Sequence, residues 1–130
     1  MRKIEYILIL ISCLLLQACP ASCDDKEVSV TVQNDTEEEL FCAFCSIPPY
    51  ASYNFFNISP YSKKMDGPFS MNDIKSQGLS LWIVRAKTVE KHGWDSVIKN
   101  QLYDSVLEYS WDELSSKNYV VKIYSINHEN

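Results

Sequence analysis

The chain has little of what most enzymes and nucleic-acid-binding proteins need. It contains two histidines, His92 and His128, and neither lies at metal-ligand spacing from another candidate ligand. It has no glycine-rich phosphate loop and no nucleophilic serine in a Gly-x-Ser-x-Gly turn. The longest basic run is Lys63-Lys64, and the formal net charge of −5 repels a phosphate backbone. We therefore expect no catalytic centre, no metal or other cofactor, and no nucleic-acid partner.

Glycine is also scarce, with three in 130 residues, and 46% of the residues are hydrophobic. This composition is typical of a folded domain and argues against wholesale disorder. The acidic runs Asp24-Asp25, Glu37-Glu38-Glu39 and Asp112-Glu113 are interpreted as tether, turn and helix cap, not as paired catalytic carboxylates.

The N-terminal segment has the pattern of an export signal. A basic start, Met1-Arg2-Lys3, precedes an apolar run over 4–16, which is shorter than the roughly 20 residues that span a bilayer. The run ends in Leu16-Gln17-Ala18-Cys19, which resembles the bacterial lipobox. That resemblance implies cleavage before Cys19 and acylation of its thiol and amine. An ordinary cleaved signal with a chance cysteine is the alternative.

We accordingly expect a signal peptide over 1–18, a lipidated tether over 19–26 and one globular domain over 27–127. Cleavage removes two basic residues and one acidic residue, so the net charge of the mature chain becomes −6. Cys19 would anchor the protein in the cell envelope. Pro20 after it favours the outer membrane, and Asp24-Asp25 resembles the surface-export signals of Bacteroidetes lipoproteins. Both a periplasmic and a surface-exposed orientation stay open.

Hydrophobic periodicity predicts mostly strands. Val28, Val30 and Val32 alternate with polar residues, as in a half-buried strand, and 40–45 is a second strand that would complete a hairpin over 28–45. Further strands are expected over 54–59, 79–87, 103–109 and 119–126, with the strand over 79–87 inside a sheet. Asp66-Gly67-Pro68 is expected to form a turn.

Two short helical insertions are expected late in the chain. One would begin at Thr88 and be interrupted by Gly93, and the other would begin at the capping box Ser110-Trp111-Asp112-Glu113. Ser70 could cap a further helical turn that contains Asp73. The predicted fold is mainly β, a sandwich of the immunoglobulin or transthyretin kind. An α+β antiparallel sheet with helices on one face is the alternative.

The second half of the chain resembles a family of small Bacteroidetes-type lipoproteins of unknown function. The resemblance rests on Leu81-Trp82-Ile83-Val84, Thr88-Val89-Glu90-Lys91, Trp94-Asp95-Ser96-Val97, Tyr109-Ser110 and Asp112-Glu113-Leu114. It covers residues 79–126, and it implies a compact β-rich lipoprotein domain without assigning any catalytic residue.

Three cysteines remain if Cys13 is removed and Cys19 is lipidated. Cys42 and Cys45 have the spacing of a redox motif, but on a strand their side chains would point to opposite faces. We expect instead a structural disulfide between Cys23 and Cys45, because in the expected hairpin Cys45 lies opposite Glu27. Cys42 would then be buried as a small apolar residue.

An aromatic segment over 47–61 is the one candidate binding site. Its rings could stack on sugars or fill a pocket of an envelope-protein partner, and the competing interpretation is that they pack into the core. The candidates are Tyr50, Tyr53, Phe55, Phe56 and Tyr61.

Taken with the tether, these residues predict a lipid-anchored binding or structural module of the cell envelope. The rival hypothesis is a periplasmic thiol-redox or hydrolytic enzyme, which would require a cleft containing ionisable groups.

Overall fold

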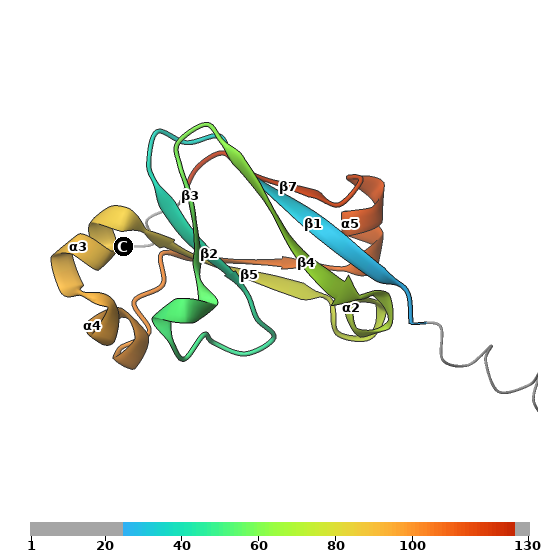
Figure 1. The fold of residues 1–130 in the computed structure, drawn as a ribbon, viewed down its shortest axis with the longest axis horizontal. Coiled ribbons are helices and arrows are strands. Elements are labelled where there is room, and N and C mark those ends of the chain that lie inside the picture. The colour runs from blue at the N-terminus through green and yellow to red at the C-terminus, as the bar shows by residue number, and fades with distance from the viewer. Residues whose placement is uncertain (1–24, 127–130) are drawn as a thin grey trace, which may run out of the picture.

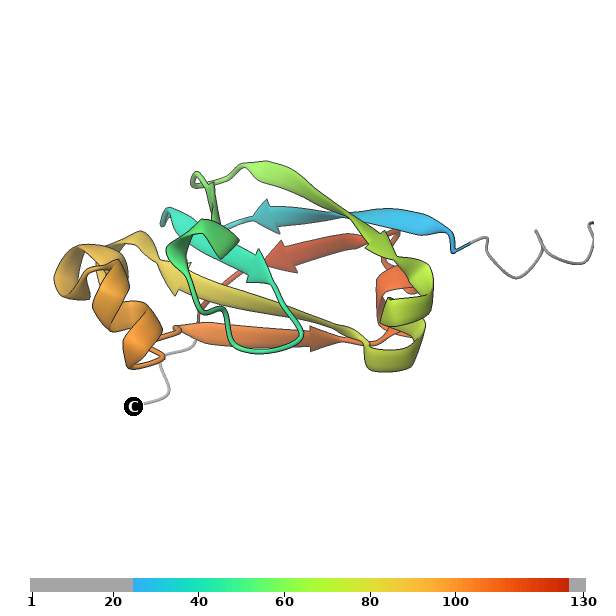
Figure 2. The ribbon, with the colours of Figure 1, turned by 60° about the horizontal axis from the view of Figure 1, so that its bottom comes forward.

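The computed structural model describes residues 25–126, which form two β-sheets packed face to face with short helices at the ends (Figures 1 and 2). The strand orders are β4-β1-β7 and β3-β2-β5-β6. The expected mainly β, sandwich-like fold with short helices is confirmed. The strands are β1 (Glu27–Asn34), β2 (Leu40–Phe44), β3 (Phe56–Ile58), β4 (Lys63–Ser70), β5 (Leu79–Arg85), β6 (Ser105–Tyr109) and β7 (Val120–Ile123). The helices are η2 (Ser52–Asn54), α2 (Met71–Gln77), α3 (Ala86–His92), α4 (Trp94–Lys99) and α5 (Trp111–Ser116).

The main core lies between the two sheets. Every second residue of β1 points inward, which is why the valine alternation of the sequence becomes a buried row. Facing residues from β2, β3, β5 and β7 complete the core, together with one buried side chain each from α2 and α5. The fully or almost fully buried members are Val30, Val32, Leu40, Cys42, Ile58, Ile74, Leu81, Ile83, Leu114, Val121 and Ile123.

A second, smaller core covers the outer face of the four-stranded sheet. Ala43 and Val84 are fully buried although they alternate with residues of the main core, so they face away from it. Val97 of α4 is also fully buried. Because an exposed sheet face of this kind must be covered, the loop after β2 and helix α4 pack against it.

The expected hairpin over 28–45 is wrong. β1 pairs with β4 and β7, whereas β2 pairs with β3 and β5, so the chain crosses from one sheet to the other after Asn34. The buried Asn34 amide holds this crossing by donating to the carbonyl oxygens of Glu38, Ile58 and Ser59 at 2.7, 3.3 and 3.2 Å. Alternation predicts which side of a strand is buried, but not which strand pairs with it.

Two local expectations are also wrong. Asp66-Gly67-Pro68 lies inside β4, where the register with β1 shifts, and it is not a turn. α3 begins at Ala86, two residues before Thr88, with Arg85 at its N-cap. Asp104 explains the earlier start, because its carboxylate accepts from the Arg85 backbone N–H and from the Thr88 hydroxyl, both at 2.8 Å.

The other helix signals are confirmed. The Ser70 hydroxyl accepts from the Asp73 N–H at the start of α2. The capping box of Ser110 and Glu113 opens α5. Gly93 separates α3 from α4, and β5 lies inside its sheet between β2 and β6.

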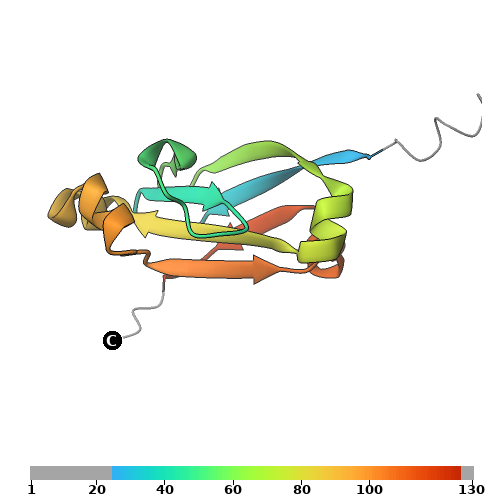
Figure 3. The same cartoon turned by 90° about the horizontal axis from the view of Figure 1, so that it is seen from below.

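The two ends of the molecule differ. α3 and α4 lie at one end, and α2, α5 and the start of β1 lie at the other (Figures 1 and 3). None of the helices in the described part of the chain is long and apolar enough to cross a membrane.

Candidate functional site

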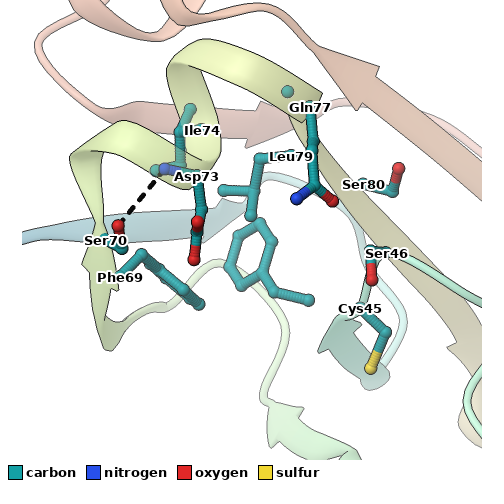
Figure 4. A pocket seen from close by; sticks show the side chains of 11 residues that line it. Cys45, Ser46, Phe69, Ser70, Asp73, Ile74, Gln77, Leu79 and Ser80 are labelled. Carbon is teal, nitrogen blue, oxygen red and sulfur yellow. Dashed lines mark hydrogen bonds between the residues drawn. The ribbon is translucent and has the colours of Figure 1, made fainter.

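A cleft of about 360 Å³ opens between α2 and the ends of β2 and β5 (Figure 4). Its floor is apolar, and the Phe44 and Phe69 rings meet edge to face at 5.2 Å. Its rim carries hydroxyl, amide and carboxylate groups. The lining residues are Phe44, Cys45, Ser46, Phe69, Ser70, Asp73, Ile74, Gln77, Gly78, Leu79 and Ser80.

The cysteine in this cleft is poorly suited to thiolate chemistry. Burial, and then the negative charge of Asp66, raise the pKa of the Cys45 thiol. Cys42 points into the main core, where burial raises its pKa to about 12. Redox motifs depend on a depressed thiol pKa, so both shifts oppose that use of the Cys-x-x-Cys spacing.

The aromatic segment divides between packing and exposure. The Phe55 ring lies 5.1 Å from Trp94 in the smaller core, and the Phe56 ring lies 6.4 Å from Phe44. The tyrosines face solvent, with exposed fractions of 68% for Tyr50, 76% for Tyr53 and 68% for Tyr61. The segment therefore contributes phenylalanines to packing and tyrosines to the surface.

Tyr50 borders a surface groove of about 460 Å³ between η2 and α4. The Tyr53 ring meets Tyr50 edge to face at 6.2 Å. On the α4 side the groove offers the carboxylate of Asp95 and the ammonium of Lys99, one helical turn apart. The lining residues are Tyr50, Ala51, Ser52, Trp94, Asp95, Ile98 and Lys99.

The smaller core holds the two walls of this groove together. Trp94, at the start of α4, contacts Phe41 of β2 at 5.0 Å and also Phe55. The Tyr103 hydroxyl donates to the Pro49 carbonyl oxygen at 2.6 Å, and its ring stacks on Phe55 at 6.3 Å. The tyrosines therefore stand on a packed base, which reduces the entropy that binding would cost.

The groove combines the groups that bind polyhydroxylated ligands. Tyrosine faces present the apolar surface on which a sugar ring stacks, while a carboxylate and an ammonium can accept from and donate to its hydroxyls. A hydrogen bond with Tyr50 raises the pKa of Tyr53 above its ordinary value. We give the name aromatic groove to the lining residues Tyr50, Trp94, Asp95, Ile98 and Lys99 together with Tyr53, which does not line the hollow but contacts the Tyr50 ring.

The remaining sequence candidates do not join either hollow. Cys19, Cys23 and His128 lie outside the described residues. His92 is the last residue of α3, and no group of three or more metal-ligating side chains occurs within residues 25–126. The Cys23–Cys45 disulfide stays a prediction. The hairpin from which this pairing was inferred does not form. Asp25 nevertheless accepts a hydrogen bond from the hydroxyl of Ser70, and Ser70 lines the same cleft as Cys45.

Comparisons with family models, curated proteins and solved structures find no match to this chain.

Sequence reasoning missed the α4 half of the aromatic groove. The spacing of Trp94, Val97 and Ile98 is typical of a buried helical face, and on α4 Val97 is buried while Trp94 and Ile98 are half-buried. The sequence feature that could have indicated this half is the pair Asp95 and Lys99, which lie four residues apart on the exposed side of the same helix. What the sequence could not indicate is that η2 packs beside this helix.

Proposed function

We propose that the protein is a lipid-anchored lipoprotein of the cell envelope that binds saccharide chains in the aromatic groove. The observation that carries the proposal is the exposed Tyr50–Tyr53 pair beside Asp95 and Lys99. Exposed aromatic side chains next to a few converging polar groups are typical of a recognition surface.

The position of the groove supports the same proposal. It lies toward the end with α3 and α4, whereas β1 begins at the opposite end (Figure 1). A tether of eight residues before β1 spans at most about 30 Å, at roughly 3.5 Å per extended residue. Anchored through Cys19, the domain would present the aromatic groove away from the membrane.

Titration of the purified full chain with oligosaccharides of the cell envelope tests the proposal, with tryptophan fluorescence as the readout because Trp94 lines the groove. Tyr50→Ala and Tyr53→Ala should each weaken binding about tenfold, the equivalent of one lost aromatic contact of roughly 1.4 kcal/mol.

Tyr61→Ala is the matched control. Tyr61 is as exposed as Tyr50, but it does not line the groove. Equal losses for all three variants, or no saccharide binding by the unmodified chain, would show that the groove is not a saccharide site.

A further inference from the structure

Within residues 25–126, β7 is an edge strand with one unpaired side. It pairs in parallel with β1, and the Thr31 and Asp35 N–H groups donate to the carbonyl oxygens of Tyr119 and Ile123, both at 2.9 Å. Successive strand residues turn their main-chain groups to opposite sides. The open side therefore carries the N–H groups of Lys122 and Tyr124 and the carbonyl groups of Val120 and Lys122.

A hollow of about 330 Å³ borders this open side. It is lined by Tyr109, Lys117, Val120, Lys122 and Tyr124, and the Lys117 ammonium lies 5.5 Å from the centre of the Tyr109 ring. Two lysines and no carboxylate line it. The cleft beside α2 and the aromatic groove, by contrast, each contain an aspartate.

The charge of this edge selects among occupants. A second copy pairing through the same edge would bring the same lysines together, which is unfavourable. An acidic segment would meet two ammonium groups and unpaired main-chain donors at once. Addition of a strand to an open edge obtains affinity from the main chain and specificity from alternate side chains.

We propose that the β7 edge binds an extended segment of a partner protein in which acidic and apolar residues alternate. The segment adds a fourth strand to the sheet β4-β1-β7 and bonds to the open main-chain groups of Val120, Lys122 and Tyr124. Its carboxylates lie on the face of Lys122 and pair with Lys117 and Lys122, and its apolar side chains lie on the opposite face, toward the core, where they contact Tyr109. This site is separate from the aromatic groove and does not depend on saccharide binding.

The test uses the full chain in detergent and two capped, fluorescein-labelled peptides, Glu-Val-Glu-Val-Glu and Lys-Val-Lys-Val-Lys. Fluorescence anisotropy should show saturable binding of the acidic peptide. The basic peptide should bind at least about tenfold more weakly, from the two ion pairs together with the repulsion that replaces them.

Lys122→Pro removes an N–H that the domain itself does not use in strand pairing, and proline is tolerated on edge strands. It should abolish acidic-peptide binding while the urea unfolding midpoint stays close to that of the unmodified chain. If this variant does not fold, the pair Lys117→Glu and Lys122→Glu serves instead, and it should reverse the preference between the two peptides.

The pair Lys63→Glu and Lys64→Glu, on the opposite edge strand β4, is the matched control with the same change of net charge. An equal loss in this control would mean non-specific charge attraction and would overturn the proposal. Unchanged binding by Lys122→Pro would also overturn it. No binding of either peptide would mean that the lysines only guard the edge against pairing.

Discussion

Asn34 shows how a single buried polar side chain can determine a chain crossing. It is fully buried, and its amide nitrogen donates to three carbonyl groups on the segments that follow β1 and β3. Its amide oxygen accepts from the N–H and the hydroxyl of Thr36 at 3.0 and 2.7 Å. Both the nitrogen and the oxygen of the Asn34 side-chain amide are therefore hydrogen-bonded at the point where the chain leaves one sheet for the other.

Asn34→Ala should lower the free energy of unfolding by about 2–4 kcal/mol, because it leaves several buried carbonyl and N–H groups without partners. Urea denaturation measures the change. Asn57→Ala is the control, since the exposed Asn57 amide donates only to Glu39, and its effect should stay within about 0.5 kcal/mol. Equal effects of the two substitutions would mean that the Asn34 network does not stabilise the crossing.

Helices α2 and α3 end at glycines whose backbone conformations other residues avoid. Gly78 follows α2 with φ 74° and ψ −167°, and Gly93 follows α3 with φ 76° and ψ 154°. Both lie in a region that is essentially restricted to glycine. They differ in surroundings, because a Cβ on Gly78 would lie 2.7 Å from the Tyr109 carbonyl oxygen, whereas a Cβ on Gly93 would meet nothing within 4 Å.

Gly93→Ala should therefore cost about 1–3 kcal/mol from backbone strain alone. Gly78→Ala carries the same strain plus a clash with the backbone of β6, so it should cost more. Thermal or urea unfolding of the two variants side by side gives the comparison. A larger loss for Gly93→Ala would contradict the close approach of α2 to the end of β6.

Element types were predictable from the sequence to the extent that they are local. Valine alternation, the serine caps and Gly93 each indicated an element that the structure contains, because each acts within a few residues. Strand partners were not predictable. The β1–β2 crossing depends on the Asn34 amide reaching Ile58 and Ser59, which lie more than twenty residues away in the chain.

The candidate site was predictable in part for the same reason. Tyr50, Tyr53 and Tyr61, which are exposed, were among the five candidates, but the sequence could not separate them from Phe55 and Phe56, which pack. Phe55 packs into the smaller core, where η2 and α4 meet on one face of the sheet, and Phe56 packs against the main core through Phe44.

In the whole molecule, attachment through Cys19 would give each end a different role. The end where β1 begins would face the anchor, and the end with α3 and α4 would carry the aromatic groove (Figure 1). This arrangement depends on Cys19 being the attachment point, so lipidation of Cys19 is the first prediction to test.

The intact, non-reduced mass of the protein purified from the membranes of its own host tests that claim directly. We expect a chain that begins at Cys19, carries three acyl chains, and is lighter by the hydrogens that one disulfide removes. That disulfide should map to Cys23 and Cys45 after digestion. A soluble chain with three free thiols would contradict both the lipidation of Cys19 and the disulfide. Cys42 and Cys45 would then become the first candidates for a thiol-redox reaction.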